Sequence, residues 1–402
     1  MPTWLARRSA SEQRLLVLAA LLGFAALIQH WYTIAEGIST HFAADVRSYE
    51  AMARAAPHFP TTKILQPFAE RFPFHWLVGV TSDAGVSLDL VYRVASIACL
   101  LGVVFTVHAT LSRLGLALSE YGLAMAALVA SAYPFHYLLA SPGMLTDAML
   151  VLGESLLLLG FVRGWLWLVL LGLAVGSLGR QTMVPVGLVA ALWAYAAPAW
   201  RPHRLRTAAL CALVPGAIYL VLNLVARRFG YPEPGGWHDL SVLGFFDEGW
   251  WATVQHFGRV FLGVGVPLAL ALGAWLRNRN DVPRGALLVG ATIAAQPFVL
   301  GPSSNGGNEP RLAGLAAPAL VVAAGALLWG SRLSRAETLI AGTAIVVAGL
   351  HSRYTHGPLM RNYVWAGAEV AAAIILVVVI GRRSHQTDSV DARRLETTRM
   401  QT

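Results

Sequence analysis

Charged residues are scarce in this chain. Only 13% of its 402 residues are Asp, Glu, Lys or Arg, and Lys63 is the only lysine. A soluble globular domain carries about 25% charged residues, so this composition excludes a soluble enzyme or binding module. Cysteine is scarce too. Cys99 and Cys211 both lie inside apolar runs, where we interpret them as small core residues and not as a disulfide or a metal pair.

Apolar sequence fills the chain instead. Hydrophobic residues make up 56% of it, and runs of about 18 or more apolar residues predict transmembrane helices. We therefore predict an all-α polytopic membrane protein with about 11–12 transmembrane helices. The expected spans are residues 15–35, 86–111, 121–140, 144–162, 165–179, 183–199, 207–226, 258–276, 285–301, 312–329, 337–350 and 363–381. The region 144–179 is expected to form a tight hairpin.

The distribution of positive charge predicts the orientation. The net charge of +9 does not indicate nucleic-acid binding, because the arginines flank apolar spans, which is a topology signal. With the N-terminus in the cytoplasm, most arginines fall in short inner loops, as the positive-inside rule requires. We expect one transmembrane domain over residues 1–381, both termini inside and a disordered cytoplasmic tail over 382–402.

The first apolar run and the composition predict the membrane in which the protein lies. The run Leu15–Ile34 is too long for the apolar core of a signal peptide, so we expect an uncleaved first span. The Ala-, Arg- and Leu-rich composition is typical of a GC-rich bacterium. We therefore expect a multi-pass protein of the bacterial plasma (inner) membrane, with membrane lipids around it.

Two long loops fall on the outer side in this topology. They cover residues 36–74 and 227–257, and both mix aromatic residues, charges and prolines. That composition favours short helices lying at the membrane interface, with Trp and Tyr at headgroup level. Trp250 and Trp251 suit the binding of sugar rings or isoprenoid chains, and they equally suit a plain interface.

Two acidic residues lie near membrane ends on this outer side. Helical spacing places Asp45 and Tyr49 on one face, so Asp45 is a candidate general base. It also fits a simple N-cap of a short helix through Ala55. Asp147 opens an apolar span, where an acid is costly and therefore a functional candidate. The helix dipole alone would also favour it there.

Two arginines on the same side are candidates for binding an anion. Arg180 interrupts an apolar stretch against the positive-inside bias, and a guanidinium binds phosphate with two hydrogen bonds. Lipid headgroups are the alternative partner. Arg311 and Glu309 lie in a later outer loop, where Arg311 could hold a phosphate and Glu309 a sugar hydroxyl. An ordinary turn with a local ion pair is the alternative.

Further polar residues of the first outer loop could add to this anion site. They are His58, Lys63, Glu70 and Arg71. His351 and His356 are five residues apart in another outer loop, which is poor spacing for a zinc site on one helix.

Together these patterns resemble the GT-C superfamily of integral-membrane glycosyltransferases over roughly residues 15–330. The resemblance rests on Asp45 and Tyr49 followed by Pro67–Arg71, on Thr146-Asp147-Ala148, on Gly179-Arg180-Gln181-Thr182, and on Glu309 and Arg311 ahead of Pro318. It implies a polyprenyl-phosphate-linked sugar donor and a lipid, glycan or protein acceptor. It also implies Asp45 as the catalytic base, Asp147 as the second acid, and Arg180 and Arg311 on the lipid phosphate. Some relatives use a divalent metal, Mg or Mn, which the two aspartates could ligate.

The implied reaction is an inverting single displacement at the extracytoplasmic face, with the two carboxylates within about 10 Å of each other. A transporter or flippase of a lipid-linked substrate is the main alternative, and it predicts polar residues at mid-membrane depth. A polysaccharide polymerase or ligase would need a more basic outer loop. A non-enzymatic scaffold would leave the clustered outer acids without a reason.

Overall fold

The computed structural model describes residues 9–29, 43–131, 135–232, 249–278, 283–299, 309–331, 333–349 and 362–382. Within these residues the chain is almost entirely helical, with eighteen α-helices and two short strands. The α-helices are α2 (Ala10–Gln29), α3 (Ala43–Ala55), α4 (Gln66–Ala69), α5 (Phe72–Ser82), α6 (Leu88–Arg113), α7 (Leu118–Val129), α8 (Tyr137–Ala140), α9 (Leu145–Arg163), α10 (Leu166–Gly179), α11 (Met183–Ala196), α12 (Arg204–Ala226), α14 (Trp250–Arg277), α15 (Arg284–Ala294), α16 (Gln296–Val299), α18 (Glu309–Gly314), α19 (Ala317–Leu328), α20 (Arg335–Gly349) and α21 (Asn362–Gly381).

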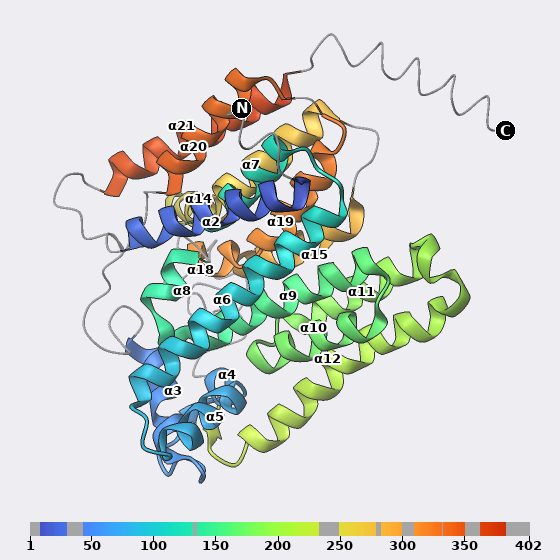
Figure 1. Ribbon diagram of the computed structural model, residues 1–402. Helices are drawn as coiled ribbons and strands as arrows, with labels where there is room; N and C mark the ends of the chain where they lie inside the picture. Colours follow the sequence, from blue (N-terminus) through green and yellow to red (C-terminus); the bar gives the residue numbers. More distant parts are fainter. Residues whose placement is uncertain are drawn as a thin grey trace.

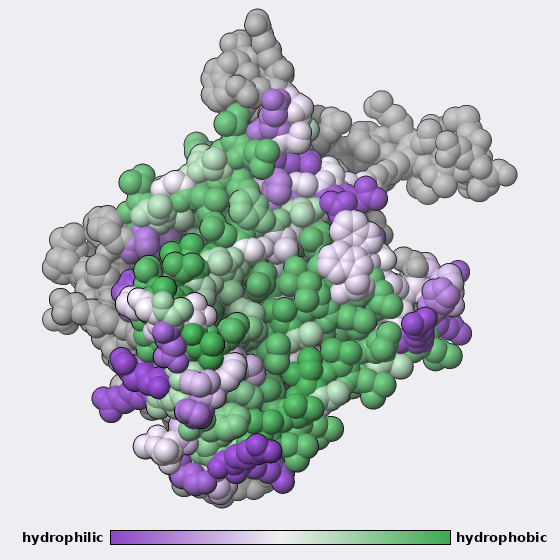
Figure 2. Space-filling model, turned by 60° about the horizontal axis from the view of Figure 1, so that its bottom comes forward, coloured by the Kyte–Doolittle hydropathy of each residue, from purple (hydrophilic) through white to green (hydrophobic). Residues whose placement is uncertain are grey.

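The helices have the length and composition of a membrane protein. Five are long and apolar enough to cross a bilayer, and they cover Ala10–Gln29, Leu88–Arg113, Pro142–Arg163, Trp200–Ala226 and Trp250–Arg277. Six shorter apolar helices accompany them. Figure 2 shows a broad hydrophobic surface with hydrophilic groups gathered toward its margins. The predicted all-α membrane architecture is confirmed at this level.

Helices α9 and α19 form the centre of the molecule (Figure 1). Nearly every residue of both helices is buried, which is what an apolar helix surrounded by other helices requires. Glu154 of α9 links them, because its carboxylate accepts a hydrogen bond of 2.9 Å from the backbone N–H of Ala319 at the start of α19. In contrast, α12 exposes large apolar side chains, among them Leu213, Leu220 and Leu224.

The predicted tight hairpin over 144–179 is present as α9 and α10. The turn uses Gly164, whose φ of 70° is left-handed and favours glycine. The two helices approach closely because they meet at glycines. A Cβ on Gly153 would lie 2.5 Å from the backbone nitrogen of Gly176, and one on Gly172 would lie 2.5 Å from that of Leu157. Small residues at such positions are the usual means of packing helices in membranes.

The hairpin brings chain segments far apart in sequence to one end of the molecule. Helix α9 begins there, α10 ends there and α11 begins there. The predicted short helices of the first outer loop, α3 to α5, also pack at this end (Figure 1). The short strands β1 (Ile64–Leu65) and β2 (Gly230–Tyr231) pair in parallel, so the two long loops predicted on one side do meet.

The opposite end of the same helices carries arginines paired with aromatic rings. The guanidinium of Arg163 lies 5.3 Å from the ring centre of Trp165 at the α9–α10 turn. That of Arg204 lies 4.9 Å from the ring of Tyr195, between α11 and α12. Arginine with Trp and Tyr is typical of a membrane–water interface. This end is the one whose residues the positive-inside rule places in the cytoplasm.

Candidate functional site

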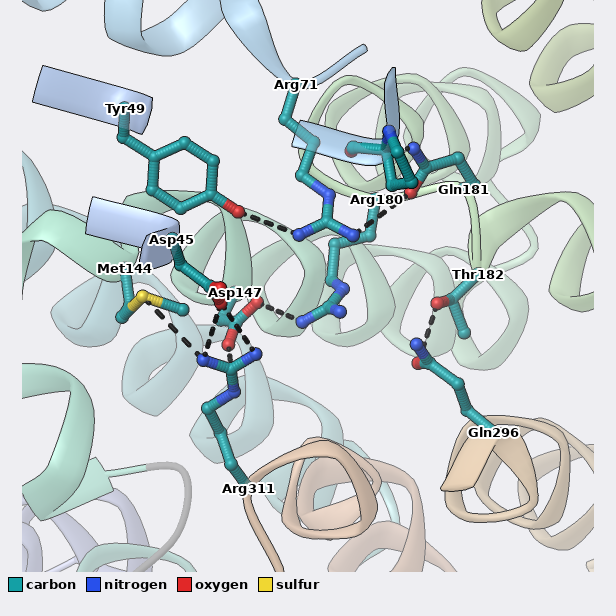
Figure 3. Close-up of polar contacts among 11 residues, drawn as sticks. Asp45, Tyr49, Arg71, Met144, Asp147, Arg180, Gln181, Thr182, Gln296 and Arg311 are labelled. Carbon is teal, nitrogen blue, oxygen red and sulfur yellow. Dashed lines mark hydrogen bonds and ion pairs between the residues drawn. The ribbon is translucent and has the colours of Figure 1, made fainter. Parts of the chain in front are cut away.

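Asp147 is the centre of a buried charged cluster (Figure 3). It lies in the first turn of α9 and is fully buried. Arg180, directly after the last residue of α10, donates a hydrogen bond from Nη1 to its Oδ1. Gly179 makes this contact feasible, since a Cβ there would lie 2.6 Å from the carbonyl oxygen of Thr146. The hairpin therefore places a guanidinium beside a carboxylate 33 residues away.

Arg311 joins the two acids that stood out in the sequence. Both of its terminal nitrogens contact Oδ2 of Asp45 at 3.2 Å, and its Nε lies 3.3 Å from Oδ2 of Asp147. Arg311 and Asp147 are buried, and Asp45 is 8% exposed. The three residues come from α18, α9 and α3. The two carboxylates therefore share one guanidinium.

Arg71 completes the cluster without a carboxylate of its own. Its Nη1 donates to the hydroxyl of Tyr49 at 2.7 Å, and its Nη2 to Oε1 of Gln181 at 3.5 Å. No carboxylate of the described residues lies within 4.0 Å of its guanidinium, although the side chain is buried. A buried charge usually has a charged partner, so this arrangement is unusual.

Gln181 connects the cluster to a second hydrogen-bond network, which surrounds the carboxylate of Glu70. Its Nε2 donates to Oε2 of Glu70 at 2.6 Å, and Nδ2 of Asn223 donates to Oε1 of Glu70 at 2.6 Å. Glu70 therefore faces neutral amides and not the guanidinium of its neighbour Arg71. Asn223 brings α12 into contact with this network.

The cluster holds more donors and positive charge than its own groups satisfy. Three guanidinia, of Arg71, Arg180 and Arg311, face two carboxylates. The buried Nε atoms of Arg71 and Arg180 have no hydrogen-bond partner among the described residues. Burial works against the charge of Arg71, but Tyr49 and the nearby carboxylates raise its pKa above its usual value. Burial also opposes the charge of Arg311, and Asp147, Tyr137 and Asp45 raise its pKa. Both residues therefore stay charged.

Tyr49 is held in place by an aromatic stack. Its ring lies parallel to that of His75, with 4.1 Å between centres, and Nδ1 of His75 lies 2.8 Å from the hydroxyl of Tyr92. Complete burial and then the charge of Arg71 lower the pKa of His75 to about 3, so its ring is neutral. The stack fixes the tyrosine that accepts the hydrogen bond of Arg71.

Glu309 lies on the other side of α18. Residues two apart on a helix point in nearly opposite directions, so Glu309 faces α14 while Arg311 faces Asp45. Its Oε1 lies 3.3 Å from Nδ1 of His256 and 3.6 Å from Arg259. Burial would raise the pKa of Glu309, but the hydrogen bond with His256 and the charge of Arg259 lower it below its usual value. Glu309 and Arg311 therefore do not form a local ion pair with each other.

The other sequence candidates lie apart from the cluster. The side chains of His58 and Lys63 are exposed and form no hydrogen bond or ion pair with other described residues. His351 and His356 lie outside the described residues, as do residues 233–248 of the second outer loop and 383–402 of the tail. Sequence reasoning missed the contributions of His75, Tyr92, His256 and Asn223. Of these four residues, only Asn223 could have been found from the sequence, because it is the one carboxamide residue within the expected span 207–226.

The two aspartates do not form a suitable site for a divalent cation. The guanidinium of Arg311 lies between them, and Arg180 contacts the other oxygen of Asp147. Three guanidinia would repel a cation at this position. Among the described residues no group of three His, Cys, Asp or Glu side chains could hold a metal ion.

The cluster has an excess of guanidinium groups over the carboxylates that they contact. No protein-family model, no curated protein and no solved structure matches the chain. The interpretation rests on the residues themselves: arginines with unused donors suit a planar or tetrahedral oxyanion, of which phosphate is the commonest.

Proposed function

We propose that this protein is an integral-membrane glycosyltransferase of the GT-C type. It transfers a sugar from a polyprenyl-phosphate donor to an acceptor hydroxyl at the extracytoplasmic face of a bacterial plasma membrane. In this proposal eleven or twelve of the helices cross the bilayer, and both termini are cytoplasmic. The charged cluster at the head of α9 is the donor site.

The environment of Arg71 carries the proposal. Its guanidinium is buried, its direct partners Tyr49 and Gln181 are neutral, and its Nε has no partner in the part of the chain that the structure describes. A phosphate oxygen supplies both the missing charge and the missing acceptor. Arg180, whose Nε is also unpaired, offers a second contact. The phosphate of a lipid that enters from the surrounding bilayer would bring the negative charge and the hydrogen-bond acceptor to this end of the helices.

The cluster also contains the groups that a single displacement needs. Asp45 is the carboxylate with some exposure, so it is the base that an acceptor hydroxyl reaches. The acceptor oxygen attacks the anomeric carbon opposite the phosphate, which inverts the configuration. Arg71 and Arg180 stabilise the charge that develops on the departing phosphate, and such preorganised electrostatic stabilisation usually contributes more to catalysis than any other single effect.

Purified protein in nanodiscs tests this proposal. Radiolabelled polyprenyl-phosphate sugars and a membrane lipid extract are supplied to the wild type and to the variants Asp45→Asn and Arg71→Gln. We expect transfer by the wild type and a loss of at least about a hundredfold in either variant. The matched control is Asp89→Asn, which removes a half-buried carboxylate whose one ion-pair partner among the described residues is Arg93, at 2.6 Å.

Equal transfer in the wild type and both variants would contradict the assigned roles. Absence of transfer from every donor, with the protein folded, would contradict the enzyme itself. In that case the same nanodiscs are used to measure lipid flux, because a transporter or flippase of a lipid-linked substrate would use the same anion site. Loss of donor binding in Arg71→Gln would then still locate that site.

A further inference from the structure

The two carboxylates of the cluster are held unequally. Asp147 is fully buried and contacts two guanidinia, of Arg180 and Arg311. Asp45 contacts a single guanidinium of the described residues, that of Arg311, and its side chain is 11% exposed. Both nitrogens of Arg311 reach the same oxygen of Asp45 at 3.2 Å, whereas good charge-assisted pairs measure about 2.7–2.9 Å. Asp45 therefore depends on Arg311 alone, whereas Asp147 keeps the hydrogen bond of Arg180 even if Arg311, 3.3 Å away, turns to another ligand.

The charge of the cluster indicates which kind of ligand would replace Asp45 on the guanidinium of Arg311. The three guanidinia exceed the two carboxylates of Asp45 and Asp147 by one positive charge, since the nearby carboxylate of Glu70 is held by neutral amides, and a phosphodiester carries one negative charge. Binding such a ligand makes a buried cluster neutral, which removes the cost of an uncompensated charge. A phosphodiester also satisfies Arg311 with two parallel hydrogen bonds, where Asp45 offers a single oxygen.

We propose that the phosphate of the incoming donor displaces Asp45 from Arg311, and that this displacement creates the catalytic base. This inference rests on the proposed function. Without a donor, Asp45 is paired with Arg311 and is a poor base. Once the phosphate takes its place, the Asp45 carboxylate is free beside the bound sugar. Asp147 keeps its contact with Arg180 and acts as a positioning residue.

The step then conserves charge within the cluster. The freed Asp45 carboxylate takes the proton of the acceptor hydroxyl and becomes neutral. The acceptor oxygen forms its bond to the anomeric carbon, the bond from that carbon to the phosphate oxygen breaks, and the electron pair stays on the phosphate. The phosphate gains the negative charge that Asp45 loses, so the buried cluster remains neutral through the reaction.

Binding of a lipid phosphate without any sugar measures this displacement. Farnesyl phosphate is titrated by calorimetry into the detergent-solubilised wild type and into Asp45→Asn, Asp147→Asn and Asp89→Asn. We expect Asp45→Asn to bind it roughly tenfold more tightly, because the internal competitor for Arg311 is gone. Asp147→Asn should not bind farnesyl phosphate more tightly than the wild type does. The increase in affinity caused by Asp45→Asn should be absent when Asp45→Asn is combined with Arg311→Gln. Farnesol, which lacks the phosphate, should not distinguish the proteins.

Equal or weaker binding by Asp45→Asn would overturn the displacement. A second measurement needs no variant. A carbodiimide with an amine nucleophile labels free carboxylates, and mass spectrometry reads each site in the wild type. We expect farnesyl phosphate to increase labelling of Asp45 and to leave Asp147 unlabelled. Unchanged or reduced labelling of Asp45 would also overturn the proposal.

The two proposals fail in different ways. Tighter binding by Asp45→Asn without sugar transfer from any donor would support the displacement and reject the transferase. Sugar transfer by the wild type without tighter binding by Asp45→Asn would support the transferase and reject the displacement.

Discussion

At the scale of single residues, His75 makes the stability of the fold depend on pH. Its pKa is about 3 in the folded protein and 6.5 as the ordinary value. The unfolded chain therefore binds a proton that the folded protein does not, and His75 stabilises the fold fully only above pH 6.5. As the pH falls below 6.5, the unfolding temperature of the wild type should fall. In His75→Asn, which keeps a polar partner for Tyr92, the part of this decrease that His75 causes should be absent. Parallel pH profiles of the two proteins would contradict the assignment.

Asp45 and Arg311 show how much of the candidate site could be predicted from the sequence. Both were identifiable, because each is a charged residue close to an expected membrane end. Their contact was not, since 266 residues separate them and only the packing of α3 against the other helices brings them together. Glu309 was identified on the same grounds as Arg311, but it faces the opposite side of α18. The direction of a side chain depends on a helix register that the flanking Gly- and Pro-rich sequence does not reveal.

At the scale of the elements, apolar runs predicted where helices form but not where they end. A helix occupies at least part of each of the twelve expected spans. The span expected over 285–301 is interrupted: α15 ends at Ala294 and the separate turn α16 begins at Gln296. Pro297 accounts for this, because it has no N–H to donate to the carbonyl of Ile293 and its ring crowds that carbonyl. The span expected over 121–140 ends early, as α7 stops at Val129.

The α9–α10 hairpin gives a prediction for one element. Gly172→Leu places side-chain atoms where the backbone of Leu157 already lies, so the helices have to separate. We expect a loss of about 1–3 kcal/mol in stability. A loss of sugar transfer should accompany it, because the separation moves Arg180 away from Asp147. The matched control is Gly216→Ala in α12, where an added Cβ meets nothing within 4 Å. That variant should unfold at or slightly above the wild-type temperature.

At the scale of the molecule, the two ends differ in chemistry. One end collects the acids and the guanidinia of the cluster, and the other carries arginine paired with exposed aromatic rings. The positive-inside rule assigns the second end to the cytoplasm. The sidedness stays a prediction, and it depends on composition summed over many loops, which is less sensitive to packing than any single contact.

Cysteine labelling in intact cells tests the sidedness. Cys99 and Cys211 are buried and are replaced by alanine, and single cysteines are introduced by Asp83→Cys or His203→Cys. Both positions are exposed, at opposite ends of the molecule. A membrane-impermeant maleimide should label Asp83→Cys in intact cells and His203→Cys only after permeabilisation. The reverse pattern would place the charged cluster in the cytoplasm and exclude an extracytoplasmic site.

The ion pair between Asp147 and Arg180 also has a consequence for how the protein is made. Asp147 lies near the start of α9, a helix long and apolar enough to cross a bilayer, but its partner Arg180 follows only after the whole hairpin has been synthesised. An unpaired carboxylate is costly in lipid. Helices α9 and α10 should therefore leave the insertion machinery together, as one unit, and not one after the other. If translation stops after α9 and before α10, α9 should not insert stably into the membrane.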